Sequence, residues 1–297
     1  MEPIIQACTL CPRDCGADRR SGRGLCGGGP RVKLARAALH FWEEPCISGD
    51  RGSGTVFFSG CPLHCCFCQN YPISAQNFGK EVPVERLAAI FLELQAQGAH
   101  NINLVTASHY VPWVLEALRL ARPALKLPVV YNSGGYERLE TLRMLEGAVQ
   151  VYLPDLKYRD AALSARYSAA PDYFGQASRA ILEMYRQVGP LELGEDGTLR
   201  RGLVVRHLVL PKAWRDSVAL LEWLADSLPL DSFYLSLMSQ YTPCWHSGDF
   251  PELGRRVSTY EYNRVLERAQ ELGFSGFLQE RSSAKEEYTP PFHLEGV

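Results

Sequence analysis

Three cysteines stand close together in a short stretch, Ser59-Gly60-Cys61-Pro62-Leu63-His64-Cys65-Cys66-Phe67-Cys68. Cys61, Cys65 and Cys68 follow the spacing C-x3-C-x2-C, with the aromatic Phe67 just before the last cysteine. One tight loop with this spacing can supply three thiolates to a single [4Fe–4S] cubane. The fourth iron then has no protein ligand, so a small molecule with an amine and a carboxylate can chelate it. A structural zinc site is the alternative, but such a site normally takes four protein ligands.

Four more cysteines lie nearer the N-terminus and have the spacing C-x2-C-x3-C-x10-C: Cys8, Cys11, Cys15 and Cys26. Four thiolates within nineteen residues indicate one metal site when the compartment is reducing. A closed tetrahedral Zn²⁺ site and an auxiliary iron–sulfur cluster both fit the pattern. We favour structural zinc, because it would fold a segment with few core residues. Cys66 is off the C-x3-C-x2-C positions, and we expect it to pack as a small apolar residue.

The elements that must position these cysteines are short apolar runs that alternate with amphipathic helical patterns. Such runs, bounded by glycine, proline or polar residues, are typical of buried strands. Six runs fit, at 55–58, 102–105, 128–131, 149–153, 203–209 and 233–237, and a seventh short strand is expected at 274–278. Helical patterns cover 83–97, 109–122, 136–146, 171–188 and 214–227, and Ser258 with Glu261 predicts a capping box for a helix that Gly273 ends.

Repeated strand–helix units predict right-handed crossovers and a parallel sheet. Six such units are two fewer than a complete barrel, so the fold class is α/β, a partial parallel (β/α)6 barrel with a small Cys-rich N-terminal segment. We place the Cys-rich metal-binding segment at residues 1–50 and the barrel, with its C-terminal extension, at 51–297. Chemistry in parallel barrels collects at the C-terminal ends of the strands, and Cys61 comes just after the first of them.

The three-cysteine motif, its aromatic residue and its place after the first strand resemble the radical S-adenosylmethionine (SAM) superfamily. The resemblance implies that Cys61, Cys65 and Cys68 hold a [4Fe–4S] cluster whose unique iron binds SAM. It further implies reductive cleavage of SAM to methionine and a 5′-deoxyadenosyl radical, which removes a hydrogen atom from a substrate. The cofactors carry this chemistry, and the protein supplies position and an electron path.

Segments downstream resemble the subgroup of pyruvate formate-lyase activating enzyme and its uncharacterised iron–sulfur homologues. Asp155-Leu156-Lys157 is similar to its D-L-K signature, and Asn132-Ser133-Gly134-Gly135-Tyr136 to its Thr-Asn-Gly-type segment. Arg206, before Val209-Leu210-Pro211, is similar to its Arg-x-Val-Val-x-Pro pattern. The resemblance implies SAM contacts from Asn132, Ser133, Asp155, Lys157 and Arg206. A plain salt bridge is the alternative for Asp155 and Lys157, and an internal ion pair for Arg206.

The second predicted strand departs from that subgroup, because it ends Thr106-Ala107-Ser108-His109-Tyr110 where the subgroup has Gly-Gly-Glu. The contacts to the SAM amine must therefore differ. Thr106 and Ser108 are our candidates, although a serine there can instead begin a helix. His109 is a candidate for facing the substrate, and Gln240, after the sixth strand, is a candidate for the adenosine pocket.

The net charge of −2 gives no support for nucleic-acid binding. No apolar stretch approaches the roughly 20 residues that span a bilayer, so we expect a soluble, cytoplasmic protein. The resemblance implies an electron donor such as flavodoxin or ferredoxin and a monomeric enzyme. Glycyl radical enzyme activation is the function that it suggests. The alternatives are radical modification of a peptide or small molecule and, in another class, a non-catalytic metal-binding module. The proline-rich stretch 289–291 is expected to be a surface extension.

Overall fold

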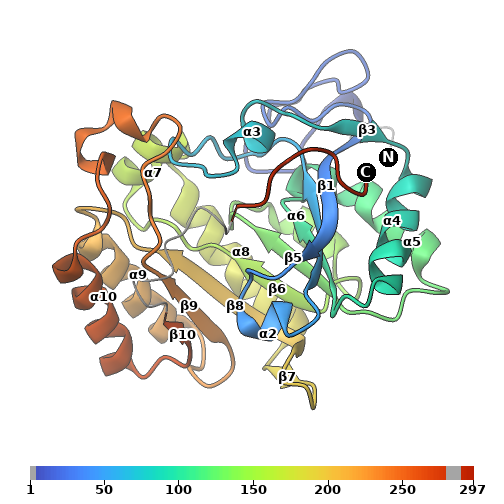
Figure 1. The fold of residues 1–297 in the computed structure, drawn as a ribbon. Coiled ribbons are helices and arrows are strands. Elements are labelled where there is room, and N and C mark those ends of the chain that lie inside the picture. Colours follow the sequence, from blue (N-terminus) through green and yellow to red (C-terminus); the bar gives the residue numbers. More distant parts are fainter. Residues whose placement is uncertain (1–4, 279–288) are drawn as a thin grey trace.

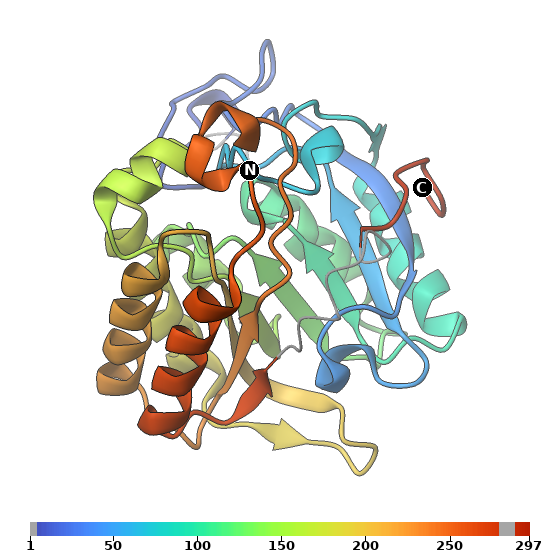
Figure 2. The ribbon, with the colours of Figure 1, turned by 60° about the vertical axis from the view of Figure 1, so that its left-hand side comes forward.

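The computed structural model describes residues 5–278 and 289–297 and shows a curved, mostly parallel sheet with helices along its outer side (Figure 1). The strand order is β10-β9-β8-β6-β5-β4-β2-β1-β3, and β7 pairs with β8 outside this path. Neighbouring strands from β2 to β10 run parallel, whereas β1 is antiparallel to both β2 and β3. Figure 2 shows the sheet as an incomplete barrel whose two ends do not meet.

The seven parallel strands coincide with the seven apolar runs expected from the sequence, so that prediction is confirmed. They are β2 (Ser53–Phe58), β4 (Ile102–Val105), β5 (Val129–Ser133), β6 (Val151–Pro154), β8 (Leu199–Leu208), β9 (Tyr234–Met238) and β10 (Gly276–Leu278). The remaining strands are β1 (Val32–His40), β3 (Lys80–Val82) and β7 (Glu192–Leu193).

The expected helices also form, and they cover the outer face of the sheet. They are α4 (Val84–Ala96), α5 (Val111–Ala121), α6 (Leu139–Met144), α8 (Tyr173–Val188), α9 (Trp214–Ser227) and α10 (Thr259–Leu272), and the structure adds α2 (Pro45–Ser48), α3 (Tyr71–Ser74) and α7 (Ala161–Ser168). The Ser258–Glu261 capping box begins α10, and Gly273 ends it in the left-handed conformation. In the described part of the chain, no helix has the length and apolar character that crossing a membrane requires.

Strand residues alternate between two faces of the sheet, and each face packs into its own core. The larger core lies between the strands and the outer helices and contains, for example, Val56, Leu104 and Tyr131. A smaller core fills the lower end of the barrel, where Val130, Val151, Leu153 and Val204 pack with Cys46 and Ile47 of α2. The β1–α2 connection therefore enters the barrel and closes its lower end.

Strand β1 was not expected from the sequence, because the first strand that we predicted was at residues 55–58. It pairs with β2 from Leu34 to His40 and extends the sheet past the first parallel strand. The antiparallel pairing depends on a partner far along the chain, which local sequence patterns do not specify. As a result, residues 32–40 form part of the sheet even though the cysteines before them lie outside it.

The C-terminal tail, residues 289–297, docks against β1 (Figure 1). Its proline-rich stretch lies at the surface, as expected, and leads into the packed part of the tail. Ala37 N donates to Glu295 O at 2.8 Å, and Leu294 N donates to Ala35 O at 3.1 Å. Phe292 packs edge-on against Phe57 with ring centroids 5.4 Å apart. The tail thus lies along β1 on the side where the barrel is open.

Candidate functional site

The loop after β2 carries Cys61, Cys65 and Cys68 and is held by close contact with the N-terminal segment. Cys61 N donates to Cys26 O at 3.1 Å. Gly60 has φ +88°, and a Cβ there would lie 2.2 Å from Cys26 O. Only glycine allows both this backbone conformation and this close approach. The two cysteine-rich stretches are therefore in direct backbone contact.

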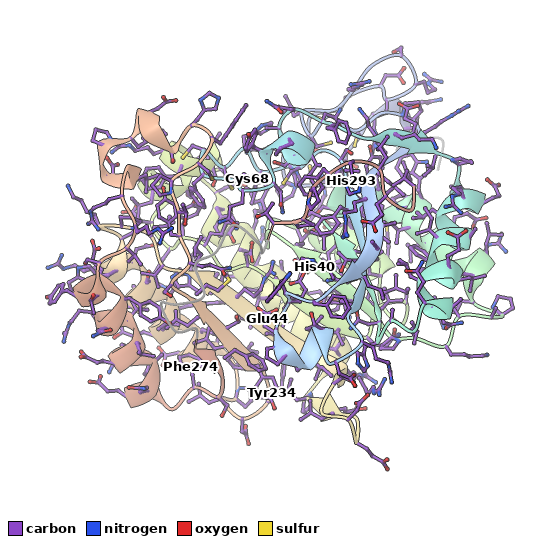
Figure 3. The ribbon with its side chains drawn as sticks, viewed as in Figure 1. His40, Glu44, Cys68, Tyr234, Phe274 and His293 are labelled. Carbon is purple, nitrogen blue, oxygen red and sulfur yellow. The ribbon has the colours of Figure 1, made fainter. Side chains whose placement is uncertain are left out.

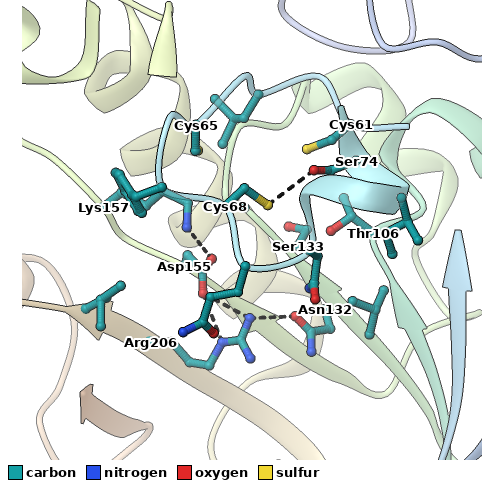
Figure 4. Close-up of a pocket in the computed structure, with 18 of the residues that line it drawn as sticks. Cys61, Cys65, Cys68, Ser74, Thr106, Asn132, Ser133, Asp155, Lys157 and Arg206 are labelled. Atoms are coloured by element: carbon teal, nitrogen blue, oxygen red, sulfur yellow. Dashed lines mark hydrogen bonds and ion pairs between the residues drawn. The ribbon is translucent and has the colours of Figure 1, made fainter. Parts of the chain in front are cut away.

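Two of the three thiols meet hydroxyl groups. Ser168 Oγ donates to Cys65 Sγ at 2.9 Å. Cys68 Sγ lies 3.2 Å from Ser74 Oγ, as Figure 4 shows. Hydrogen bonds of this kind stabilise a sulfur that carries negative charge and tune a cluster bound to it. Cys66 is buried in the outer core, as expected, and does not line the cavity beside the loop.

A cavity of about 260 Å³ lies beneath this loop at the C-terminal ends of the strands. Cys61, Cys65 and Cys68 line one end of it (Figure 4). The polar residues proposed from the sequence as SAM contacts line the cavity too, with the exception of Ser108: they are Thr106, Asn132, Ser133, Asp155, Lys157, Arg206 and Gln240. The structure therefore brings together residues that are up to 179 positions apart, from Cys61 to Gln240.

Ser108 and His109 point away from this cavity, contrary to our expectation. Ser108 Oγ is buried and donates to Glu137 Oε1 at 2.5 Å. His109 is also buried, and its Nε2 lies 2.9 Å from Ser59 O. Both residues lie in a 3-10 turn over Ser108–Tyr110, which directs Ser108 towards Glu137 after β5 and His109 towards the N-terminal segment. Of the two candidates for the missing Gly-Gly-Glu contact, only Thr106 faces the cavity.

Charged side chains form a partly buried network on the cavity wall below the cysteines, and Lys157 lies nearest to them (Figure 4). Lys157 Nζ donates to Asp155 Oδ2 at 2.6 Å, and Arg206 Nε donates to Asp155 Oδ1 at 2.9 Å (Figure 4). Arg206 Nη2 donates to Asn132 Oδ1 at 2.7 Å. Burial alone would raise the pKa of Asp155, but Arg206 and Lys157 outweigh it and hold that pKa below its ordinary value. Asp155 is thus a carboxylate with two cationic partners.

Glu43, on the β1–α2 connection, completes this network and was missed in the sequence. Arg206 Nη1 donates to Glu43 Oε2 at 3.2 Å. Asn103 and Asn132 donate their amides to Glu43 Oε1 at 3.2 Å and 3.1 Å. The available signal was the acidic pair Glu43-Glu44 directly after the apolar alternation of residues 32–40, which indicates a strand leading into the sheet.

The side chains around the cavity fit a [4Fe–4S] cluster and SAM. Three thiols face the cavity from one loop, and burial raises the pKa of Cys61, an effect that Lys157 offsets in part. No group of three or more His, Cys, Asp or Glu side chains in residues 5–278 and 289–297 is arranged to hold a single metal ion. A cubane is larger than one ion, so its ligands need not converge on one point. Across the cavity, carboxylate, ammonium, amide and hydroxyl groups suit the charged ends and ribose of SAM.

The N-terminal cysteines lie around Cys26 but do not converge on one point. A closed tetrahedral zinc site would require such convergence. Interactions with Cys8 and Cys15 help to raise the pKa of Cys26, although burial is the larger cause. Arg19 lies beside them, fully buried, with Nη1 4.0 Å from Cys8 Sγ. The described residues give Arg19 no carboxylate in salt-bridge contact, and its guanidinium lies over the rings of Tyr110 and Trp113. A buried cation of this kind suits a group of thiolates.

The chain was compared with family models, with curated proteins and with solved structures. No family model matches the chain. The uncharacterized protein MJ0674 of Methanocaldococcus jannaschii is 29% identical over 279 residues, which cover 90% of this chain and 75% of that protein. The FeFe-hydrogenase maturase HydG from Carboxydothermus hydrogenoformans has a TM-score of 0.52 at 11% identity, and the match covers 86% of this chain and 57% of HydG. Methylornithine synthase (PylB) has a TM-score of 0.48 at 15% identity, with 79% and 63% covered.

The fold resembles that of HydG, whose match has the TM-score of 0.52. This confirms the fold class expected from the sequence, an α/β chain with a mostly parallel barrel sheet and a Cys-rich N-terminus. The chain spans less than two thirds of the length of either solved structure. At these levels of identity, the likeness concerns the fold alone.

Replacing Arg206 tests whether the buried network depends on this cation. We expect Arg206→Met to lower the free energy of unfolding by about 3–5 kcal/mol at pH 8, because Asp155 and Glu43 lose their shared partner. Burial already raises the pKa of Glu43. Lower pH protonates such a carboxylate and removes the uncompensated charge, so the loss should be smaller at pH 5. Urea unfolding at both values measures it, with exposed Arg31→Met as the control. Equal losses at the two pH values would contradict the interpretation.

Gly135 joins β5 to the cavity wall and offers a second test. Its φ is +75°, and a Cβ there would lie 2.1 Å from Asp155 O. Gly147 has almost the same φ, +76°, but a Cβ there meets nothing within 4 Å. We expect Gly147→Ala to cost about 1–2 kcal/mol from the backbone alone. Gly135→Ala should cost about 1–3 kcal/mol more, because the wall must move. Thermal unfolding of both variants measures the difference, and equal costs would argue against a tight wall.

Proposed function

We propose that this chain is a radical SAM enzyme that removes a hydrogen atom from its substrate. One observation carries the proposal: three thiols from a single loop line a cavity that Asn132, Asp155 and Lys157 also line. The fourth cysteine of the loop, Cys66, is absent from the cavity lining. This is the ligand set that leaves one iron of a cubane open to a chelating amine and carboxylate. The fold likeness to radical SAM enzymes supports the same proposal.

The side chains of the cavity have distinct roles in this proposal. When bound, the cluster supplies the electron that cleaves SAM to methionine and a 5′-deoxyadenosyl radical. Lys157 is placed to meet the SAM carboxylate, and Asp155 accepts hydrogen bonds from the amine or the ribose hydroxyls. Asn132 and Ser133 add short polar contacts at the end of β5, and Thr106 replaces the contact that Gly-Gly-Glu makes in the resembling subgroup. Gln240 lies at the cavity edge, where the adenosine would bind.

Activation of a glycyl radical enzyme is the more specific function that we infer from the sequence resemblance. It requires that a protein partner reach the cavity. Modification of a peptide or of a small molecule is the second candidate. An electron donor such as flavodoxin or ferredoxin would serve either reaction. If no purified protein partner forms a glycyl radical on incubation with this chain and SAM, modification of a peptide or small molecule is favoured.

The N-terminal cysteines form a second metal centre in this proposal, either structural zinc or an auxiliary iron–sulfur cluster. Arg19 supports a negatively charged centre, since it is a buried cation beside Cys8 and it lowers the pKa of Cys26 in opposition to burial. A zinc ion and an iron–sulfur cluster would each carry net negative charge when bound by four thiolates. The lack of convergence on a single point makes the larger cluster as good a fit as zinc.

Cys65→Ala is the direct test of the cluster ligands. We expect this variant to lose 5′-deoxyadenosine formation from SAM and to bind less iron and sulfide after anaerobic reconstitution, while its far-UV circular dichroism stays unchanged. Cys66→Ala is the matched control, because it removes the neighbouring thiol, which is packed in the core. That control should reconstitute and cleave SAM as the parent does. SAM cleavage by Cys65→Ala would reject the ligand assignment.

Metal analysis of the Cys61/Cys65/Cys68→Ala triple variant tests the N-terminal centre. We expect this variant to retain metal, because Cys8, Cys11, Cys15 and Cys26 are intact. About one equivalent of zinc per chain indicates a structural site, and residual iron with sulfide indicates an auxiliary cluster. A metal-free variant that remains folded would contradict a second centre.

A further inference from the structure

The inner face of the barrel holds buried polar atoms that have no hydrogen-bond partner in the described residues. They are Oε2 of Glu44, Oδ1 of Asn103 and the hydroxyl of Ser236. Glu44 is 8% exposed, and Asn103 and Ser236 are fully buried. Buried polar groups in native proteins nearly always have partners, so unsatisfied groups gathered on one face call for an explanation.

These residues come from elements that meet inside the barrel. Glu44 lies on the β1–α2 connection, Asn103 on β4 and Ser236 on β9. Burial raises the pKa of Glu44, and Ser236 lies close enough to oppose this shift in part. Even so, neither Ser236 Oγ nor Glu44 Oε2 makes a hydrogen bond of normal geometry. Figure 3 shows Glu44 between β1 and the β8–β9 side of the sheet, below Cys68. The unpaired atoms therefore face a region between the two halves of the barrel.

This region is continuous with the proposed SAM cavity through shared side chains. Arg206 and Asn132 line that cavity and also bond to Glu43, the neighbour of Glu44. The charge of Arg206 also acts on Glu44. A molecule held by Glu44 would thus lie on the opposite side of Arg206 and Asn132 from the cluster loop. A hydrogen donor for the proposed reaction belongs in such a position.

The charges of this cluster do not balance. Asp155, Glu43 and Glu44 are three carboxylates, whereas Arg206 and Lys157 are two cations. Asp155 takes Lys157 and shares Arg206 with Glu43. Glu44 has no ion pair in the described residues. Protonation of Glu44 would remove its charge but would leave its Oε2, and Oδ1 of Asn103, without hydrogen-bond partners. A ligand that brings both N–H donors and positive charge satisfies both needs.

We infer that the inner face of the barrel binds the substrate through a protonated amine, which Glu44 and Asn103 accept while Ser236 assists. The inference deepens the proposed function and rests on it, because it names the substrate class of the same site. The carboxylate of Glu44 is the charge partner of the ammonium, and Asn103 Oδ1 accepts a second N–H. Glu44 is thus a binding residue and takes no part in SAM cleavage.

Three small probes, each with a three-carbon chain, test the charge requirement: n-propylammonium, n-propanol and propionate. The full chain is reconstituted anaerobically, left oxidised and saturated with SAM, so that no turnover occurs and the SAM site is filled. Saturation-transfer NMR titrations then give the affinity for each probe. We expect n-propylammonium to bind at least tenfold more tightly than n-propanol, and propionate to show no binding.

Glu44→Gln keeps the size of the side chain and removes its charge, and it should reduce n-propylammonium binding at least tenfold. Exposed Glu195→Gln is the matched control and should bind as the parent does. Ser236→Ala is a second variant that leaves Glu44 in place, and we expect it to weaken binding about threefold. Circular dichroism checks that each variant is folded.

Equal binding of n-propylammonium and n-propanol would overturn the inference. Unchanged binding in Glu44→Gln would do the same. So would weaker probe binding to the SAM-saturated chain than to the chain without SAM, because that would place the probe in the SAM cavity. Probe binding does not require SAM cleavage. A chain that binds the probe but forms no 5′-deoxyadenosine when reduced would refute the proposed function and leave the amine site standing as a separate observation.

Discussion

The guanidinium of Arg206 is the interaction on which the site depends. From β8 it bonds to Asp155 at the end of β6, to Asn132 on β5 and to Glu43 on the β1–α2 connection. A lysine could not replace it, because three acceptors in different directions require the fixed fork of arginine. Burial of a charge is costly unless it is paired, so the cation and its carboxylates hold one another in place. The ends of three parallel strands and the loop inside the barrel are thereby fixed as one unit.

Contact between the N-terminal segment and the cluster loop is the second constraint. The bond from Cys61 N to Cys26 O and the required glycine at position 60 leave no space between the two cysteine-rich stretches. Arg13 extends this contact, because its Nε donates to Pro62 O at 2.7 Å and its Nη2 donates to Ser168 O at 3.1 Å. Ser168 in turn donates to Cys65. The N-terminal segment therefore holds the loop that carries the three thiols in place.

Local sequence patterns predicted the barrel well, because each parallel strand is a short apolar run bounded by glycine, proline or polar residues. The site residues Cys61, Asn132 and Asp155 were also predictable, because they lie at or just after the C-terminal ends of strands, which meet at one end of the sheet. The same reasoning failed for Ser108 and His109, because a 3-10 turn directs their side chains away from the strand end. It also missed β1, Glu43, Glu44 and the docked tail. Each of these depends on partners far along the chain: β1 on β2, Glu43 on Arg206 and the tail on β1. Sequence spacing carries no information on such pairings.

The elements that the sequence did not predict are those that turn an open sheet into an enclosed site. A partial barrel leaves its inner face exposed at one side, and three features cover that face here. Residues Cys46 and Ile47 of α2 fill the lower end, Phe292 of the tail packs on Phe57, and Glu43 reaches the strand ends from below. The parallel strands therefore position the polar residues of the cavity, and the segments near the two ends of the chain enclose it.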